Sequence, residues 1–324
     1  MNGFNLAALA PVETELRPLK PLGPFSYGRL AEGLAESIGT VGLLRPLLVW
    51  SRGSEPFLVA GRLRREALLS LGRTTAPALV LPADYPQEKA LALALADNRE
   101  RGWNQAETAL VWRFLVEELG PEAAVSLAGY LDLAQSPKLR QWSFSAAGLP
   151  EKGLRALAEG RLDLEIGARL ALWAPENRDA ALELFDRLNP SKQKKKQWLD
   201  WLEDVSRREK TTTAEILAAE EIQAALAEAE RAGRPTAEEA ARKYLWSRRH
   251  PLLAELAAGR QARLRSLNLP RAARLELDPT FEDLKFSLEL TFSTPADFAK
   301  LAEAVAGLRH SPDFQRLLDD DHER

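Results

Sequence analysis

Residues 43–72, LLRPLLVWSRGSEPFLVAGRLRREALLSLG, contain the elements that decide the fold of the N-terminal part of the chain. Two short apolar runs, at residues 43–50 and 56–60, are bounded by Gly, Ser and Arg, as buried strands usually are. The stretch between them has the composition of a turn. Gly61 then opens an amphipathic helix, and Gly72 provides a left-handed stop. This segment therefore predicts a strand, a turn, a second strand and a helix.

The regions that follow are predicted to change from mixed α and β structure to all helix. A strand is expected over residues 76–81 and a helix over residues 86–98, because Ala, Leu, Glu and Lys with a proline start favour a helix. No convincing strand appears between Trp103 and about Arg271. The amphipathic segments in the middle of the chain predict helices over residues 105–118, 122–131, 136–146, 150–159, 163–173, 176–188, 191–209 and 212–231.

The C-terminal segment has the clearest strand pattern in the chain. Residues 284–292 alternate between apolar and polar side chains, and an earlier strand is expected at residues 274–278, across a turn at 279–283. Thr294 then caps an expected helix over residues 295–308. A hairpin with one helix buries too little surface to be stable alone. Its apolar face must therefore meet the preceding helices or a second subunit.

Length and these patterns together predict an α+β protein that is mainly α. At 324 residues, the chain exceeds what one hydrophobic core usually serves. We expect an α+β domain over residues 1–103 and an all-helical domain over 104–232. A small α+β domain over residues 233–324 follows the Gly-Arg-Pro sequence at 233–235.

Composition excludes several classes of site. With 0 cysteines there are no disulfides, thiolate zinc sites or thiol catalysis, and 3 histidines make a histidine metal cluster improbable. The net charge of -3 requires any nucleic-acid surface to be local. The apolar patch at residues 6–11 is too short to span a bilayer and follows no basic segment, so a cytoplasmic location is expected.

Candidate chemistry gathers in the first hundred residues. The glycine at the entry of the helix after Gly61 leaves backbone N–H groups at the positive end of the helix dipole, which suits a phosphate. Arg64, on the first turn, can bind phosphate oxygens in a bidentate manner. Asp97 and Asn98 offer oxygen ligands of the kind that Mg²⁺ accepts. Taken separately, each of these is more often a structural cap or a surface charge.

The order of three short motifs gives a closer indication. Residues 42–46 (GLLRP) precede a strand, residues 61–67 (GRLRREA) form a strand-to-helix junction, and residues 97–101 (DNRER) lead into the next helix. Over residues 16–188 this arrangement resembles the ParB family of partition proteins, whose first domain is also described as a ParB-like nuclease domain. The resemblance implies a ParB/sulfiredoxin-like N-terminal domain followed by a helical DNA-binding domain with a helix-turn-helix.

In function, the resemblance implies chromosome or plasmid partition on the nucleoid, through a CTP-dependent clamp of two subunits around DNA. The implied partners are double-stranded DNA, a second copy of the chain and a partition ATPase, and the implied cofactors are CTP and Mg²⁺. Asn98 would also hold Mg²⁺, and Asp97 stands where the family has a glutamate linked to hydrolysis. The nucleotide-binding residues implied are Gly42, Pro46, Gly61, Arg62, Arg64, Ala67, Asn98 and Arg101.

The chain also departs from the family pattern at the second and third motifs. Leu63 replaces the first arginine of a pair, Glu66 occupies a position that is usually basic, and Asp97 is one methylene shorter than glutamate. A carboxylate near a triphosphate would repel it. These departures favour nucleotide binding over hydrolysis, so that any CTP hydrolysis is weak. They also leave open a degenerate adaptor or transcriptional regulator that has kept the fold and lost the nucleotide.

The expected DNA-binding segment lies in the middle domain. Residues 122–131 and 136–146 have the lengths of a helix-turn-helix, and a lysine run follows at residues 192–196. The ordinary alternatives are a helical hairpin with Leu139 and Trp142 in its core and a solvated lysine face. The residues expected to contact DNA are Ser136, Lys138, Arg140, Gln141, Ser143, Lys194, Lys195 and Lys196.

A metal-dependent nuclease is a lower-ranked alternative. It would need clustered carboxylates to hold metal ions at the scissile phosphate. The candidates near the third motif are Asp84, Glu88, Asp97 and Glu100, and their spacing guarantees no compact pair. The related sulfiredoxin chemistry needs a cysteine at the glycine-rich helix entry, and the chain has none.

Overall fold

The computed structural model describes residues 6, 9–29, 31–52, 55–99, 101–130, 133, 136–277 and 286–319. It divides into two compact units, residues 1–238 and 239–324. Within the described part, no helix combines the length and the apolar character needed to cross a membrane. The turn expected at residues 279–283 and the nuclease candidate Glu100 lie outside the described residues.

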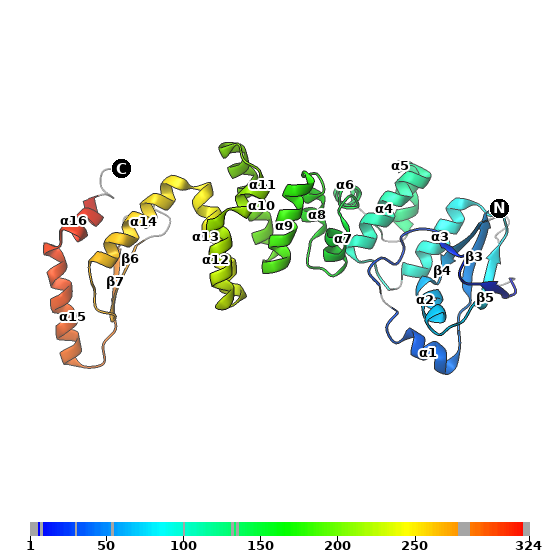
Figure 1. Ribbon diagram of the computed structural model, residues 1–324, viewed down its shortest axis with the longest axis horizontal. Helices are drawn as coiled ribbons and strands as arrows, with labels where there is room; N and C mark the ends of the chain where they lie inside the picture. Colours follow the sequence, from blue (N-terminus) through cyan, green and yellow to red (C-terminus); the bar gives the residue numbers. More distant parts are fainter. Residues whose placement is uncertain are drawn as a thin grey trace. The chain divides into compact units, whose positions relative to one another are not determined.

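A mixed five-stranded sheet forms the centre of the N-terminal part (Figure 1). The strand order is β1-β5-β3-β4-β2, in which β3 pairs antiparallel with β4 and parallel with β5. The three strands predicted from the sequence are present, although the first begins at Leu47 rather than at residue 43. Two edge strands, β1 and β2, were not predicted. The strands are β1 (Val12–Glu15), β2 (Lys20–Pro21), β3 (Leu47–Arg52), β4 (Glu55–Ala60) and β5 (Thr75–Leu81).

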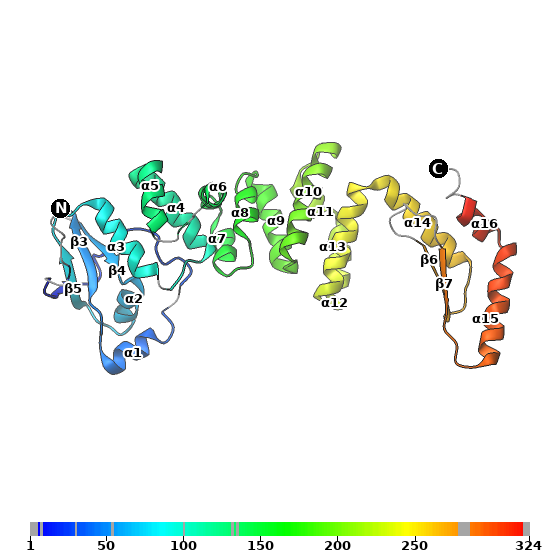
Figure 2. The same cartoon turned by 180° about the vertical axis from the view of Figure 1, so that it is seen from behind.

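Both faces of this sheet are covered. Alternate residues of β3 and β4 point to opposite sides, as the two-residue period of a strand requires. Val49 and Leu58 join a cluster with Leu68 of α2 (Arg62–Ser70). Trp50 and Val59 join a second cluster that contains the buried residues of α3 (Gln87–Arg99). α1 (Leu34–Val41) packs beside α2, as both views show (Figures 1 and 2).

The middle of the chain is helical throughout its described residues, as predicted. The second core cluster extends from the sheet into α4 and α5 through Trp112 and Ala124, so these helices pack directly on the N-terminal domain. The boundary expected between residues 103 and 104 stays a prediction. The helices are α4 (Gln105–Leu119), α5 (Pro121–Tyr130), α6 (Pro137–Ala146), α7 (Glu151–Ala158), α8 (Leu164–Leu170), α9 (Pro175–Leu188), α10 (Lys192–Glu209), α11 (Thr213–Ala218) and α12 (Glu220–Arg231).

One expected helix, over residues 212–231, is two helices in the structure. Ala219 has an extended conformation, with φ −56° and ψ 140°, which ends α11 and begins α12. The side chain of Gln223 donates a hydrogen bond of 2.7 Å to the carbonyl of Leu217. This bond satisfies one of the carbonyls that the break leaves without a helical partner.

The boundary expected at residues 233–235 is close to the division between the two units. It is the start of a helix rather than a loop, because α13 (Arg234–Arg249) begins there with a proline in its first turn. The second unit also contains helices that the sequence analysis missed. It holds α14 (Pro251–Ser266), β6 (Ala273–Leu277), β7 (Phe286–Leu290), α15 (Pro295–Gly307), η2 (Leu308–His310) and α16 (Pro312–Asp319).

The predicted C-terminal hairpin and helix are present. β6 and β7 pair antiparallel, with Leu275 opposite Leu288, and α15 begins at a Thr294 cap. Apolar side chains remain exposed in this unit: Leu288 is 38% exposed, Phe292 51% and Phe298 46%. The fold class is therefore confirmed as α+β and mainly α, with a mixed sheet followed by helices.

Candidate functional site

A pocket of about 280 Å³ opens where the N-terminus of α2 meets the C-terminal end of α3. Seven residues from the second and third sequence motifs line it: Gly61, Arg62, Leu63, Arg64, Asp97, Asn98 and Arg101. Sequence motifs that lie more than thirty residues apart therefore meet at one place. Loop residues 21–26 supply part of the remaining wall, including Phe25 and Ser26.

Glycine is the only residue type that position 61 accommodates without strain. Its φ of 102° lies in the left-handed region. A Cβ atom there would lie 2.7 Å from Leu47 Cδ2 and 3.2 Å from Arg64 Nε. Because Gly61 has no side chain, nothing from the cap residue covers the first-turn amides of α2. The space beside those amides suits a small anion.

Arg64 is anchored at one nitrogen and has donors remaining at the others. Its Nη1 donates to the carbonyls of Arg45 at 3.0 Å and Pro46 at 2.9 Å. Its Nη2 lies 3.4 Å from Asp97 Oδ2. Burial lowers the pKa of Arg64, against the opposing effect of Asp97, and Arg45 lowers it further. A half-buried guanidinium with one weak carboxylate partner gains from a second anion.

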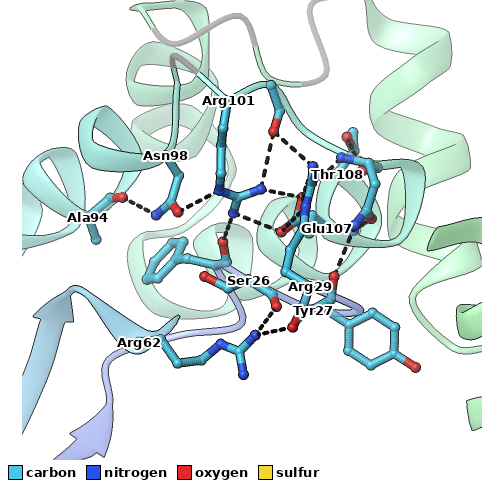
Figure 3. A network of polar contacts seen from close by, with 12 residues as sticks. Ser26, Tyr27, Arg29, Arg62, Ala94, Asn98, Arg101, Glu107 and Thr108 are labelled. Carbon is cyan, nitrogen blue, oxygen red and sulfur yellow. Dashed lines mark hydrogen bonds and ion pairs between the residues drawn. The ribbon is translucent and has the colours of Figure 1, made fainter. Parts of the chain in front are cut away.

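Arg101, in contrast, uses all of its side-chain donors in hydrogen bonds within the protein (Figure 3). A guanidinium has five N–H donors. Nε donates to Asn98 Oδ1 at 3.0 Å, Nη1 to the Gly102 carbonyl and to Glu107 Oε2, and Nη2 to the Phe25 carbonyl and to Glu107 Oε1 at 2.8 Å. The expected role of Arg101 in nucleotide binding therefore requires it to leave partners that it already has.

Glu107 is the centre of this network and was not predicted as a site residue. Its carboxylate is fully buried and pairs with both Arg101 and Arg29. It also accepts from the backbone N–H of Asn104 at 3.0 Å, while the Asn104 side chain accepts from the N–H of Glu107. This is a capping box at the start of α4, and the spacing of Asn104 and Glu107 was its sequence signal.

Arg62 holds the loop that forms the opposite wall. Its Nη2 donates to the carbonyls of Ser26 and Arg29, and its Nη1 pairs with Glu66, one turn along α2. The carboxylate of Glu66 is therefore neutralised on its own helix and does not line the pocket. The repulsion expected from Glu66 toward an anion is reduced by this pairing.

Three residues expected to bind nucleotide do not line the pocket. Gly42 ends α1, where its N–H donates to the carbonyl of Ile38, and Pro46 contributes only the carbonyl that anchors Arg64. Ala67 is 1% exposed and lies in the core. The first motif therefore holds Arg64 of the second motif through backbone carbonyls and does not line the pocket itself.

A second hollow, of about 650 Å³, adjoins the pocket. The loop around Tyr27 and Arg29 forms one side, and Arg155 and Glu151 of α7 form the other. Burial, with the carboxylate of Glu151 as the next cause, raises the pKa of Tyr27 to about 12. Tyr27 therefore stays protonated over the physiological pH range.

The N-terminal half of α6 is exposed, as a DNA-contacting helix requires. Ser136 caps it by accepting from the N–H of Leu139 at 3.1 Å. Lys138 and Gln141 are exposed, and Lys138 Nζ lies 4.7 Å from the ring centre of Trp142. Leu139 is 37% exposed, so the alternative with Leu139 in a core is wrong. The turn before α6 lies largely outside the described residues.

Two of the residues expected to contact DNA are buried. Ser143 is fully buried on the inner face of α6, and Lys195 is 3% exposed on α10. Lys195 Nζ donates to the Arg161 carbonyl at 2.5 Å, and burial lowers the pKa of Lys195. Neither side chain can reach a DNA surface, so both assignments are wrong.

The remaining lysines of the run are paired with carboxylates. Lys192 pairs with Asp163 at 3.3 Å and Lys196 with Glu165 at 2.6 Å, both at the start of α8, and Lys194 pairs with Glu238. The run therefore joins α10 to its neighbours. The expected contact of Lys194 and Lys196 with DNA stays a prediction, because both side chains remain partly exposed.

Comparison with known proteins agrees with the motifs. Residues 5–99 match the ParB N-terminal domain model. The chromosome-partitioning protein Spo0J of Thermus thermophilus is 33% identical over 175 residues, which are 53% of this chain and 60% of that protein. A probable plasmid-partitioning protein ParB of the same organism is 36% identical over 159 residues, 47% of this chain and 53% of that one. The chain thus spans 60% or less of these relatives.

Solved structures of ParB proteins are also similar. One is the C-terminally truncated ParB of Caulobacter crescentus complexed to the centromeric parS site, with 20% identity and a TM-score of 0.32. It covers 57% of this chain and 96% of that chain. The same protein complexed with CTP-gamma-S has 22% identity and a TM-score of 0.25, over 54% and 98% of the two chains. The resemblance drawn from the sequence motifs is confirmed by the domain match and the sequence relatives: residues 5–99 of this chain form a ParB N-terminal domain.

Proposed function

We propose that this chain is a cytoplasmic DNA-binding protein of chromosome or plasmid partition whose N-terminal domain binds CTP with Mg²⁺. The observation that carries the proposal is the pocket at the N-terminus of α2, where Gly61 leaves room that a Cβ would fill and Arg64 retains unused donors. The relatives named for chromosome and plasmid partition support the biological role.

The residues of the pocket fit a nucleotide with a cation. The first-turn amides of α2 and the guanidinium of Arg64 are donors for phosphate oxygens. Asp97 and Asn98, on the last turn of α3, are oxygen donors of the type that Mg²⁺ prefers. When bound, Mg²⁺ would neutralise phosphate charge. Asp97 is the candidate residue for a weak hydrolysis of CTP.

DNA is proposed to contact the exposed N-terminal half of α6. The positive end of its dipole and the side chains of Lys138, Arg140 and Gln141 lie there, within reach of phosphates and base edges. We further propose a helix-turn-helix of α5 and α6, a homodimer and a partition ATPase as partner. The exposed apolar side chains of the second unit are compatible with a second copy.

A second candidate function has its own supporting observation. All five donors of Arg101 are used by the protein, and Arg62 is bound to two loop carbonyls and Glu66. A pocket in which two arginines are held by the protein in this way is what an adaptor without nucleotide would keep. This alternative predicts that no nucleoside triphosphate binds.

Titration of the four nucleoside triphosphates, with and without duplex DNA, separates the two functions. The proposal expects CTP to bind with a preference of more than about tenfold over the others, and indifference to all four supports the adaptor. Arg64→Lys should weaken CTP binding, because lysine loses the bidentate geometry. Arg65→Lys is the matched control, since Arg65 lies on the same helix and donates to the carbonyls of Leu16 and Arg17.

A further inference from the structure

The side chain of Asn98, which is the pocket side chain best placed to bind a cation, already makes hydrogen bonds through both its nitrogen and its oxygen. Asn98 is 8% exposed, and its Nδ2 donates to the Ala94 carbonyl at 2.7 Å. Its Oδ1 therefore faces away from the helix and accepts from Arg101 Nε at 3.0 Å. A cation at Oδ1 would lie beside a guanidinium, and like charges at that range repel. Arg101 must turn away from Asn98 before Asn98 can ligate a metal.

A buried carboxylate holds Arg101 in this place. Glu107 binds two nitrogens of Arg101, at 3.0 Å and 2.8 Å, in the parallel geometry that makes such pairs strong. Glu107 is shared, however. Arg29 Nη2 approaches Glu107 Oε2 at 3.1 Å from the other side, as Figure 3 shows. Two guanidinium groups therefore compete for one carboxylate that water does not reach.

We propose that Glu107 is a positioning residue that withholds Asn98 from the pocket by holding Arg101 against it. Arg29 moderates this hold, because it takes part of the charge of Glu107. Binding of a metal–nucleotide then requires Arg101 to release Asn98 and the Phe25 carbonyl, while Arg29 still pairs with Glu107. This inference rests on the proposed nucleotide function and adds to it the residue that regulates access.

The proposal predicts that removing Glu107 and removing Arg29 shift the affinity for CTP in opposite directions. Glu107→Gln removes the charge that holds Arg101, so the affinity for CTP with Mg²⁺ should rise, by about fivefold. Arg29→Gln leaves the whole charge of Glu107 on Arg101, so the affinity should fall by a similar factor. A purely structural role would move both variants in the same direction, because both lose part of one network.

Glutamine at position 107 is the appropriate replacement. It retains a side-chain acceptor for the Asn104 N–H, so the capping box of α4 can form. Glu117→Gln is the matched control: it removes another carboxylate from α4, paired with Arg113 at 2.7 Å and outside the pocket. Its affinity for CTP should equal that of the wild type.

The experiment is calorimetric titration of CTP into the full chain and its three variants, in Mg²⁺ and again in EDTA. The expected result is opposite shifts for Glu107→Gln and Arg29→Gln, with the gain of Glu107→Gln larger in Mg²⁺ than in EDTA. Shifts of the same sign overturn the inference, and so does a gain of Glu107→Gln that is equal in Mg²⁺ and in EDTA. Both outcomes leave the proposed nucleotide function standing. If neither the wild type nor Glu107→Gln binds CTP, the proposed function and this inference fall together.

Discussion

The chain contains two concentrations of positive charge, and the structure uses them differently. At the pocket, Arg62 and Arg64 donate mainly to backbone carbonyls from other parts of the chain, and Arg101 donates mainly to the side chains of Glu107 and Asn98. In the lysine run of α10, the exposed members pair with carboxylates of neighbouring helices, and Lys195 is buried. A guanidinium spreads five donors over a planar fork and can hold a loop while it binds an anion, whereas an ammonium has three donors at a single point.

The largest expected effect is at the arginine region. Gly61→Val should weaken CTP binding by more than about thirtyfold, ~2 kcal/mol, because a Cβ fills the space beside the amides and strains a left-handed residue. Gly72→Ala is the control, since Gly72 also has a positive φ of 74° but has no atom within 4 Å of an added Cβ. Calorimetry measures both, and equal losses would place the effect in backbone strain alone.

The lysine region should show its main effect in stability. Lys195→Met should lower the free energy of unfolding by about 1–2 kcal/mol, because the Arg161 carbonyl loses a charged donor. Lys194→Gln removes an ion pair that is half exposed, and should change stability by less than about 0.5 kcal/mol. Urea unfolding compares the two variants. A larger loss in Lys194→Gln would contradict the difference drawn here between buried and exposed lysines.

DNA binding should depend on α6 and not on the lysine run. The double variant Lys138→Gln with Arg140→Gln should bind duplex DNA about fivefold more weakly, ~1 kcal/mol, and with a shallower salt dependence. The triple variant of Lys192, Lys194 and Lys196 to Gln should bind almost as the wild type does. Fluorescence anisotropy at several salt concentrations tests this, and the reverse order would restore the lysines as a DNA surface.

The smallest expected effect is a pH dependence of Lys195. Burial holds the pKa of Lys195 below its ordinary value of 10.5 in the folded chain. Between the two pKa values the unfolded chain binds more protons, so folding stability from this residue rises with pH across that window. The stability difference between the wild type and Lys195→Met should therefore grow as the pH approaches 10.5. Below both pKa values the difference should be constant.

Local patterns predicted the parts of the fold and site that depend on neighbouring residues. The junction at Gly61 follows from a strand, a glycine and an amphipathic helix in sequence, and the last turn of α3 brings Asp97 and Asn98 to the same end of the sheet. The pocket could be expected from these spacings. The edge strands β1 and β2 could not, because they are short and stabilised by pairing with β5 and β4.

Long-range partners were the main omission. Arg29 lies 78 residues before Glu107, and no local pattern connects them. The burial of Lys195, however, had a signal. Lys195, Trp198, Leu199 and Leu202 follow the helical spacing of i, i+3, i+4 and i+7, and all four are buried. A run of lysines was read as a polar surface because the side chains were considered by type and not by face.

The capping box of α4 restricts the number of residues that can lie between Arg101 and Glu107. Glu107 closes the box three residues after Asn104 and grips Arg101 six residues before itself. One residue inserted between Asn104 and Glu107 would break the three-residue spacing of the box and move Glu107 relative to Arg101. In this segment, the same spacing of residues sets both the start of α4 and the position of Arg101 in the pocket.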